Sequence, residues 1–183
     1  MLSLVALTAA AHAGPAAGRV HWWLGSYNEN YTSLNNKFIS AHDGVDGVMY
    51  CCTGLQVLAN GSVAPPPPFL SSLVRVAHSA GPAMLPVATA TAAILGGDAA
   101  RAIPQLVKLA AASGADGLVS DYEPHDNTTA VHARAYADYL TKLASALHAA
   151  KLKLAVCISD WGILGASHWP VLRAAGADQY VSM

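Results

Sequence analysis

The stretch Asp116-Gly117-Leu118-Val119-Ser120-Asp121-Tyr122-Glu123 decides the fold of this chain and points to its chemistry. It predicts a buried strand over 116–121 that leads into two carboxylates, Asp121 and Glu123. Because side chains alternate along a strand, residues two apart point to the same side. A barrel strand would deliver this pair to one point at its carboxyl end, where hydrolysis of a glycosidic bond needs a proton donor and a charge partner. The alternative is a solvated pair of loop acids beside a helix cap.

Strand-like and helix-like segments alternate along the rest of the chain. Six strands are predicted, over 19–24, 45–52, 84–88, 116–121, 152–158 and 178–183. Helices are predicted at 33–42 and 169–175, and three more have apolar residues at helical spacing within 70–77, 103–110 and 136–147. Pro104 either kinks its helix or marks its start. Residues 54–63 are expected to form a small hairpin or loop, with Asn60-Gly61 as its turn.

Alternating units of this kind predict an α/β fold with a parallel sheet and right-handed crossovers. Two junctions look alike, Gly114-Ala-Asp116 and Gly176-Ala-Asp178, and each places a helix-ending glycine before a buried strand. A TIM (β/α)8-type barrel usually takes about 250 residues, whereas this chain has 183. We therefore expect residues 14–183 to form one incomplete barrel domain of about six β/α units. A doubly wound open sheet is the alternative, although no glycine-rich phosphate loop follows the first strand.

The composition argues against nucleic acid as a partner. Only 11% of the residues are charged, the formal net charge is -1, and Lys and Arg are scattered without a basic run. No metal or other cofactor is expected from the sequence. The three cysteines, Cys51, Cys52 and Cys157, fit no zinc spacing. Either one of the vicinal pair bridges to Cys157, or all three are core thiols.

The N-terminus predicts export from the cytoplasm. Residues 1–13 have a short apolar core and the small residues Ala11 and Ala13 around a cleavage point, as in a secretory signal peptide. The segment is too short to span a membrane, so no membrane association is expected after its removal. Three glycosylation triplets, at Asn30, Asn60 and Asn127, agree with a secreted or endomembrane-lumen glycoprotein. A buried or disordered apolar start is the alternative.

The carboxylate stretch resembles that of the chitinases of glycoside hydrolase family 18. These enzymes carry Asp-Gly-x-Asp-x-Asp-x-Glu on the fourth barrel strand, and 116–123 match it except that Val119 replaces the inner Asp. The segment 179–183 resembles the family's sixth strand, in which Met183 would precede a functional tyrosine. The Ser-x-Gly-Gly pattern usual on the third strand is absent, and 85–91 stand there instead. The layout covers the whole mature chain, and the specific motif covers about eight residues.

The resemblance implies a secreted glycosidase that hydrolyses N-acetylglucosamine-containing glycans such as chitin by a retaining mechanism assisted by the substrate. Glu123 would protonate the glycosidic oxygen, and the substrate's own acetamido oxygen would attack the anomeric carbon. Asp121 would orient the acetamido N–H and stabilise the positive charge that develops there. Asp116 and Gly117 would be the structural part of the motif. With Val119 in place of the inner Asp, Asp121 loses a hydrogen-bond partner.

Other residues are candidates for contacts with a carbohydrate. Asp160 and Trp161 follow the fifth strand, and the indole could stack on a sugar ring. Tyr50 near the end of the second strand is a further candidate for the cleft, and Met183 follows from the resemblance. Two other classes of protein remain open: a catalytically inactive chitinase-like protein that binds carbohydrate, and a truncated chain that neither binds nor cleaves.

Overall fold

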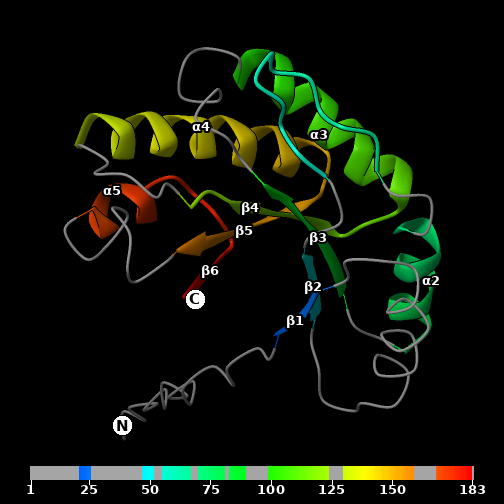
Figure 1. Ribbon diagram of the computed structural model, residues 1–183. Helices are drawn as coiled ribbons and strands as arrows, with labels where there is room; N and C mark the ends of the chain where they lie inside the picture. The colour runs from blue at the N-terminus through cyan, green and yellow to red at the C-terminus, as the bar shows by residue number, and fades with distance from the viewer. Residues whose placement is uncertain are drawn as a thin grey trace, which may run out of the picture.

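The computed structural model describes eight segments of the chain, and the account below is confined to them: residues 21–25, 47–51, 55–66, 70–80, 83–89, 99–123, 130–158 and 168–182. Six strands and four helices alternate within these segments (Figure 1). The strands are β1 (His21–Gly25), β2 (Gly47–Cys51), β3 (Ala83–Thr89), β4 (Gly117–Asp121), β5 (Lys153–Ile158) and β6 (Gln179–Ser182). The helices are α2 (Leu70–Ala80), α3 (Ala99–Ser113), α4 (Ala130–Ala149) and α5 (Trp169–Arg173).

The strands form one parallel sheet in sequence order, β1-β2-β3-β4-β5-β6. Each strand pairs with the next one along the chain, so the helices that connect them cover a single face, as in a TIM-type barrel. Figure 1 shows α2, α3, α4 and α5 arranged around the outside of a curved sheet. Among the described residues, β1 and β6 are the two edges, and the predicted incomplete α/β barrel with six strands is confirmed.

The elements differ from their predicted bounds by a few residues. β3 is one residue longer at each end than predicted, β4, β5 and β6 each begin one residue later, and α5 ends at Arg173 instead of residue 175. Pro104 lies inside α3, which begins at Ala99, so the interpretation of Pro104 as the helix start is wrong. Five residues of the helix precede this proline, so it lacks an N–H that would otherwise bond the carbonyl of Ala100. The helix predicted over 33–42 lies outside the described residues.

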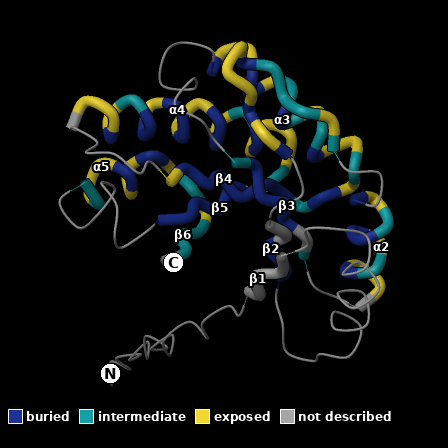
Figure 2. Tube along the Cα trace, in the orientation of Figure 1, coloured by how far each residue is buried: buried dark blue, intermediate teal, exposed yellow. Residues whose placement is uncertain are grey.

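Figure 2 shows that β3, β4 and β5 are largely buried. Their apolar residues separate into an outer and an inner layer. Outside the sheet, even-numbered residues of β4 and β5 such as Leu118 and Leu154 pack against α3 and α4, and Val48 of β2 packs against α2. Inside the curve, the alternate residues form a separate cluster of Met49, Leu85, Val87, Val119, Ala155 and Cys157. We call these six residues the interior cluster. The predicted helix-face residues Tyr136, Tyr139, Leu140, Leu143 and Leu147 are all buried in the outer layer.

Residues 55–63 form the predicted hairpin. Val57 pairs antiparallel with Val63. The turn runs from Leu58 to Gly61, whose N–H donates to the Leu58 carbonyl oxygen at 2.9 Å. Gly61 has a φ of 71°, in the left-handed region where a residue with a Cβ would be strained, so glycine suits this position. The turn is therefore centred one residue earlier than the predicted Asn60-Gly61.

The two similar junctions have similar geometry. Gly114 and Gly176 both have left-handed backbone, with φ of 76° and 80°. Two residues later, the Asp116 carboxylate accepts a hydrogen bond from the His78 ring at 2.7 Å, and the Asp178 carboxylate accepts one from the His148 ring at 2.9 Å. Each histidine is in the last turn of a helix, at the end of the sheet opposite the carboxyl ends of the strands. Both pairs therefore lie at the amino-terminal end of the barrel, where residues contribute to stability and not to catalysis.

Candidate active site

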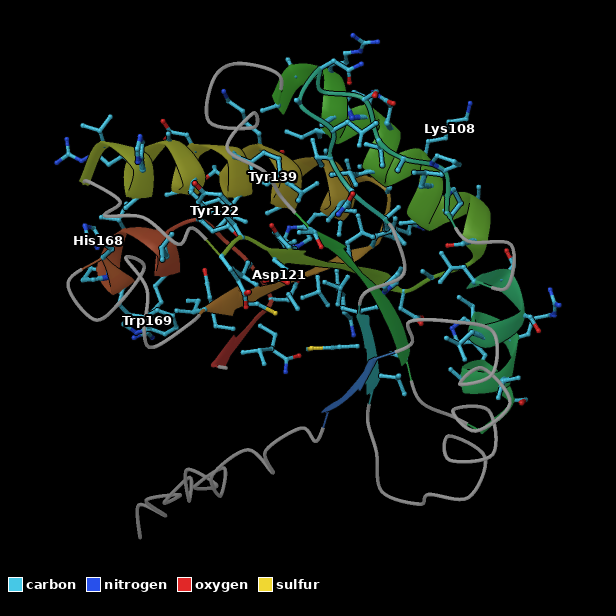
Figure 3. All side chains as sticks on the ribbon, viewed as in Figure 1. Lys108, Asp121, Tyr122, Tyr139, His168 and Trp169 are labelled. Carbon is cyan, nitrogen blue, oxygen red and sulfur yellow. The ribbon has the colours of Figure 1, made fainter. Side chains whose placement is uncertain are left out.

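The end of β4 places Asp121 inside the curve of the sheet. Val119, two residues earlier, is in the interior cluster, and alternation puts Asp121 on the same face. Asp121 is 8% exposed, and its neighbour in the register of β3 is Thr89. Figure 3 shows Asp121 on the side of the sheet away from α4. Glu123 follows two residues later and is exposed, so the two carboxylates differ sharply in their access to water.

Burial controls the protonation of Asp121. Loss of hydration, and after it the nearby charge of Glu123, raises the pKa of its carboxyl from 3.8 to about 6. Among the described residues, the Oδ1 atom of Asp121 is buried and has no hydrogen-bond partner. A carboxyl with a raised pKa and an unpaired oxygen that faces the barrel interior is a candidate for contact with a ligand.

Val119 gives Asp121 no hydrogen-bond partner from the interior face of β4. It is completely buried, and it lies with Val87 and Ala155 directly below the Asp121 position on the same face of the sheet. A valine has no hydrogen-bond donor, whereas a protonated Asp at position 119 could donate a hydrogen bond to the Asp121 carboxylate. The layer beneath the candidate site is therefore apolar, which adds to the desolvation of Asp121.

The first two residues of the motif hold the start of β4. A Cβ on Gly117 would overlap the backbone carbonyl of Lys153 and lie 2.8 Å from the Lys153 nitrogen. The Lys153 N–H donates to the Asp116 carbonyl oxygen at 2.9 Å. The side chain of Asp116 contacts His78 of α2. Glycine is therefore required where β4 and β5 approach each other closely.

A cluster of tyrosines packs against β4 from the outside. The sequence predicted Tyr136 and Tyr139 as part of an apolar helix face, without a polar contact. The Ser120 hydroxyl lies 3.0 Å from the Tyr136 hydroxyl, and both groups are buried. The ring of Tyr136 lies 5.0 Å from that of Tyr122 and 6.1 Å from that of Tyr139, centroid to centroid. Figure 3 shows Tyr122 and Tyr139 between α4 and the sheet. Burial raises the pKa of Tyr136 well above its usual value, so this hydroxyl stays neutral and can act as a donor.

The structure places only some of the other predicted site residues. Tyr50 lies in β2 with its backbone opposite Pro86, and its side chain is outside what the structure describes. Asp160, Trp161 and Met183 lie outside the described residues, as does the segment 1–13. Cys157 is buried in the interior cluster. Their roles stay predictions.

The described part of the chain contains no group of three or more His, Cys, Asp or Glu side chains placed to hold a metal ion. Within the same segments, no helix has the length and apolar character that crossing a membrane demands.

Comparison with solved structures shows what this arrangement resembles. A chitinase from Chromobacterium violaceum matches with a TM-score of 0.70 and 20% identity, over 91% of this chain and 56% of that chain. A family 18 chitinase from Cycas revoluta, solved in complex with (GlcNAc)4, gives a TM-score of 0.70 at 14% identity, over 91% and 55%. The spore cortex-lytic enzyme SleL of Bacillus megaterium gives 0.70 at 16% identity, over 91% and 42%. The sequence itself matches no protein-family model and no curated protein.

The fold and the carboxylate pair together define an incomplete TIM-type barrel with acidic residues at the carboxyl end of its fourth strand. The chain has the fold of the family 18 chitinase barrels, which confirms at the level of the fold the resemblance drawn from 116–123. It spans about half the length of the solved structures that it matches.

Proposed function

We propose that this chain is the part of a glycosidase that carries the acid residues for hydrolysis of N-acetylglucosamine-containing glycans. The observation that supports this most is the place of Asp121 and Glu123 at the carboxyl end of β4, with Asp121 facing the barrel interior. The carboxyl ends of barrel strands are where active sites of this fold lie. The matched structures include chitinases, one of them bound to (GlcNAc)4.

In the proposed mechanism, Glu123 donates its proton to the glycosidic oxygen as the bond to the leaving sugar breaks. The acetamido oxygen of the substrate attacks the anomeric carbon from the other face and forms a cyclic intermediate, which water then opens with Glu123 acting as base. Configuration at the anomeric carbon is retained because two displacements occur. The exposure of Glu123 gives it access to a leaving group at the mouth of the barrel.

Asp121 orients the acetamido group and balances the positive charge that develops on it. Within the described segments its Oδ1 has no hydrogen-bond partner, so it can accept the acetamido N–H. Burial, and after it the charge of Glu123, raises the pKa of Asp121 to about 6, so the carboxyl is ionised and can balance this charge at pH values above about 6.

A catalytically inactive carbohydrate-binding protein is the second candidate, and Val119 is the observation that favours it. Without a donor below it, Asp121 is held in place less firmly, and a rate that depends on its orientation falls. Binding of the acetamido group requires only the one accepting oxygen, so it would survive.

Hydrolysis of N-acetylglucosamine oligosaccharides followed by proton NMR tests the proposal. The anomer that forms first should have the configuration of the substrate. Inverted product would contradict the substrate-assisted mechanism, binding without cleavage would support the inactive binding protein, and neither binding nor cleavage by the folded protein would overturn both.

Secretion is part of the same proposal. A glycosidase for structural polysaccharides meets its substrate outside the cytoplasm, and residues 1–13 have the pattern of a cleaved leader. Intact-mass analysis of the protein exported from a secretory host should show a chain that begins at Gly14. Exported protein that retains Met1 would contradict this.

A further inference from the structure

We propose that Gln56, in the hairpin of residues 55–63, contacts a sugar next to the one that Asp121 binds. This inference rests on the proposed function and extends its site to a second sugar position. Nothing in the motif 116–123 indicates this residue, because it becomes part of the site only through the pairing of the hairpin with the sheet.

The first step is the position of Gln56 along the edge of the sheet. Gln56 forms a parallel bridge with Thr89, the last residue of β3, and Thr89 is the register partner of Asp121. The Val57 N–H donates to the Thr89 carbonyl oxygen at 3.1 Å, and the Thr89 N–H donates to that of Leu55 at 3.0 Å. Neighbouring strands lie nearly 5 Å apart, so the Gln56 backbone lies about 10 Å from that of Asp121. This distance exceeds a single hydrogen bond and suits a different sugar of the same chain.

The second step is the direction of the side chain. Leu55 and Val57 are 2% and 0% exposed, and both belong to the outer layer that packs against α3 and α4. Gln56 between them is exposed. In extended backbone, alternate side chains point to opposite sides, so Gln56 points to the interior side of the sheet. Thr89 alternates with Val87 of the interior cluster and lies on that side too. Gln56, Thr89 and Asp121 therefore form one polar row at the mouth of the barrel.

The third step is the rigid attachment of the hairpin. Gln105 of α3 accepts the Val63 N–H at 3.1 Å and donates to the Gly61 carbonyl oxygen at 3.3 Å. Arg101 donates to the Asn60 carbonyl oxygen at 3.2 Å. These bonds hold the hairpin on the helix side while Gln56 faces the mouth. A side chain on a fixed backbone loses less entropy on binding than one on a free loop.

The chemistry of the side chain selects its partner. A neutral amide offers two donors and one acceptor, which suits the hydroxyl and acetamido groups of an uncharged sugar. It contributes to binding equally before and during the reaction, because it is distant from the bond that breaks. Loss of the amide should therefore raise KM and leave kcat unchanged.

The test is calorimetric titration of folded Gln56→Ala with the N-acetylglucosamine tetramer and with the single sugar, in a Glu123→Gln background that cannot cleave. One neutral hydrogen bond predicts an affinity for the tetramer that is about 3- to 10-fold weaker. The affinity for the single sugar should be unchanged. The control is Lys108→Ala on the outer surface of α3 (Figure 3), which should change neither affinity.

The binding measurements distinguish a failure of the Gln56 assignment from a failure of the proposed function. If the parent protein binds the tetramer and Gln56→Ala binds it equally well, the assignment of Gln56 is wrong and the proposed function stands. If the folded parent protein binds neither ligand, the proposed function fails and this inference fails with it. A loss of affinity for both ligands in Gln56→Ala would also overturn the inference, because it would place Gln56 at the same sugar as Asp121.

Discussion

Asp121 and Val119 lie two residues apart on the same face of β4, so a carboxyl whose Oδ1 has no hydrogen-bond partner among the described residues stands directly above an apolar side chain. Burial over this layer raises the pKa of Asp121 to about 6, and the charge of Glu123 acts in the same direction. The protein therefore keeps a group that destabilises its folded state when ionised, as is common where a site is built for a ligand rather than for stability.

The first prediction concerns the pH dependence of stability. The pKa of Asp121 is about 6 in the folded protein against 3.8 for the free group, so between these values the folded state binds more protons than the unfolded state. Stability should then fall as pH rises from about 4 to above 6, by about 3 kcal/mol in total from this group. Asp121→Asn should remove this dependence and be the more stable protein at pH 7.5, with little difference near pH 3.5.

Urea unfolding followed by circular dichroism at several pH values measures this effect. The exposed Asp138→Asn on α4 is the control for loss of one negative charge. If Asp121→Asn and Asp138→Asn respond to pH in the same way, the carboxyl of Asp121 is not desolvated as described.

The second prediction concerns Val119→Asp, which places a donor beneath Asp121. If the barrel is a slow enzyme, this change should raise kcat, because the protonated new carboxyl would fix the orientation of Asp121. It should also destabilise the protein at pH 8 by about 3 kcal/mol or more, since an additional buried carboxyl must ionise or stay protonated at a cost. Val119→Thr, which nearly preserves the shape, separates the effect of a donor from that of a charge. A kcat lowered in both variants would contradict the role given to Val119.

The third prediction concerns two glycines with different constraints. Gly117→Ala should destabilise the protein by about 3 kcal/mol or more, because the new Cβ would overlap the Lys153 backbone and force β4 from β5. Gly176→Ala is the matched control, since its Cβ would have no atom within 4 Å and only the φ of 80° opposes it. That strain costs about 1 to 2 kcal/mol. Thermal melting of the two variants measures this difference. An equal loss of stability in both would contradict the prediction, because it would show that β4 can move away from Lys153.

The fourth prediction concerns the buried hydroxyl pair behind β4. Tyr136→Phe should destabilise the protein by about 1 to 2 kcal/mol, because it leaves the Ser120 hydroxyl with one partner fewer in a buried place. Ser120→Ala should cost a similar amount. The double variant should lose less than the sum, since both changes remove the same bond. Strict additivity in a denaturant series would mean that the 3.0 Å contact contributes no coupling.

The octapeptide 116–123 and the alternation of segments were enough to predict the parallel sheet and the order of its strands. Local patterns sufficed because each β/α unit buries its own apolar face against the next unit. Alternation along β4 also places Val119 on the same face as Asp121, and the interior cluster shows that this face is the inner one.

Contacts between distant segments could not be predicted in the same way. The bridge between Gln56 and Thr89 and the bonds of Gln105 join residues that are more than thirty positions apart, and no local periodicity encodes them. The hydrogen bond of Ser120 could not be predicted, because its partner Tyr136 fits the apolar face of a helix equally well without any polar contact. The burial of Asp121 depends on the interior cluster beneath it, whose residues come from several strands, so no local pattern predicts it.

The central claim is that Glu123 is the proton donor of a glycosidase, and the most direct measurement compares hydrolysis by the parent protein and by Glu123→Gln. The amide keeps the shape of the side chain but has no proton to donate. We predict that hydrolysis of N-acetylglucosamine oligosaccharides falls by at least ~100-fold, while binding measured by calorimetry on the same folded variant is largely kept. A Glu123→Gln protein that cleaves as fast as the parent protein would contradict the account.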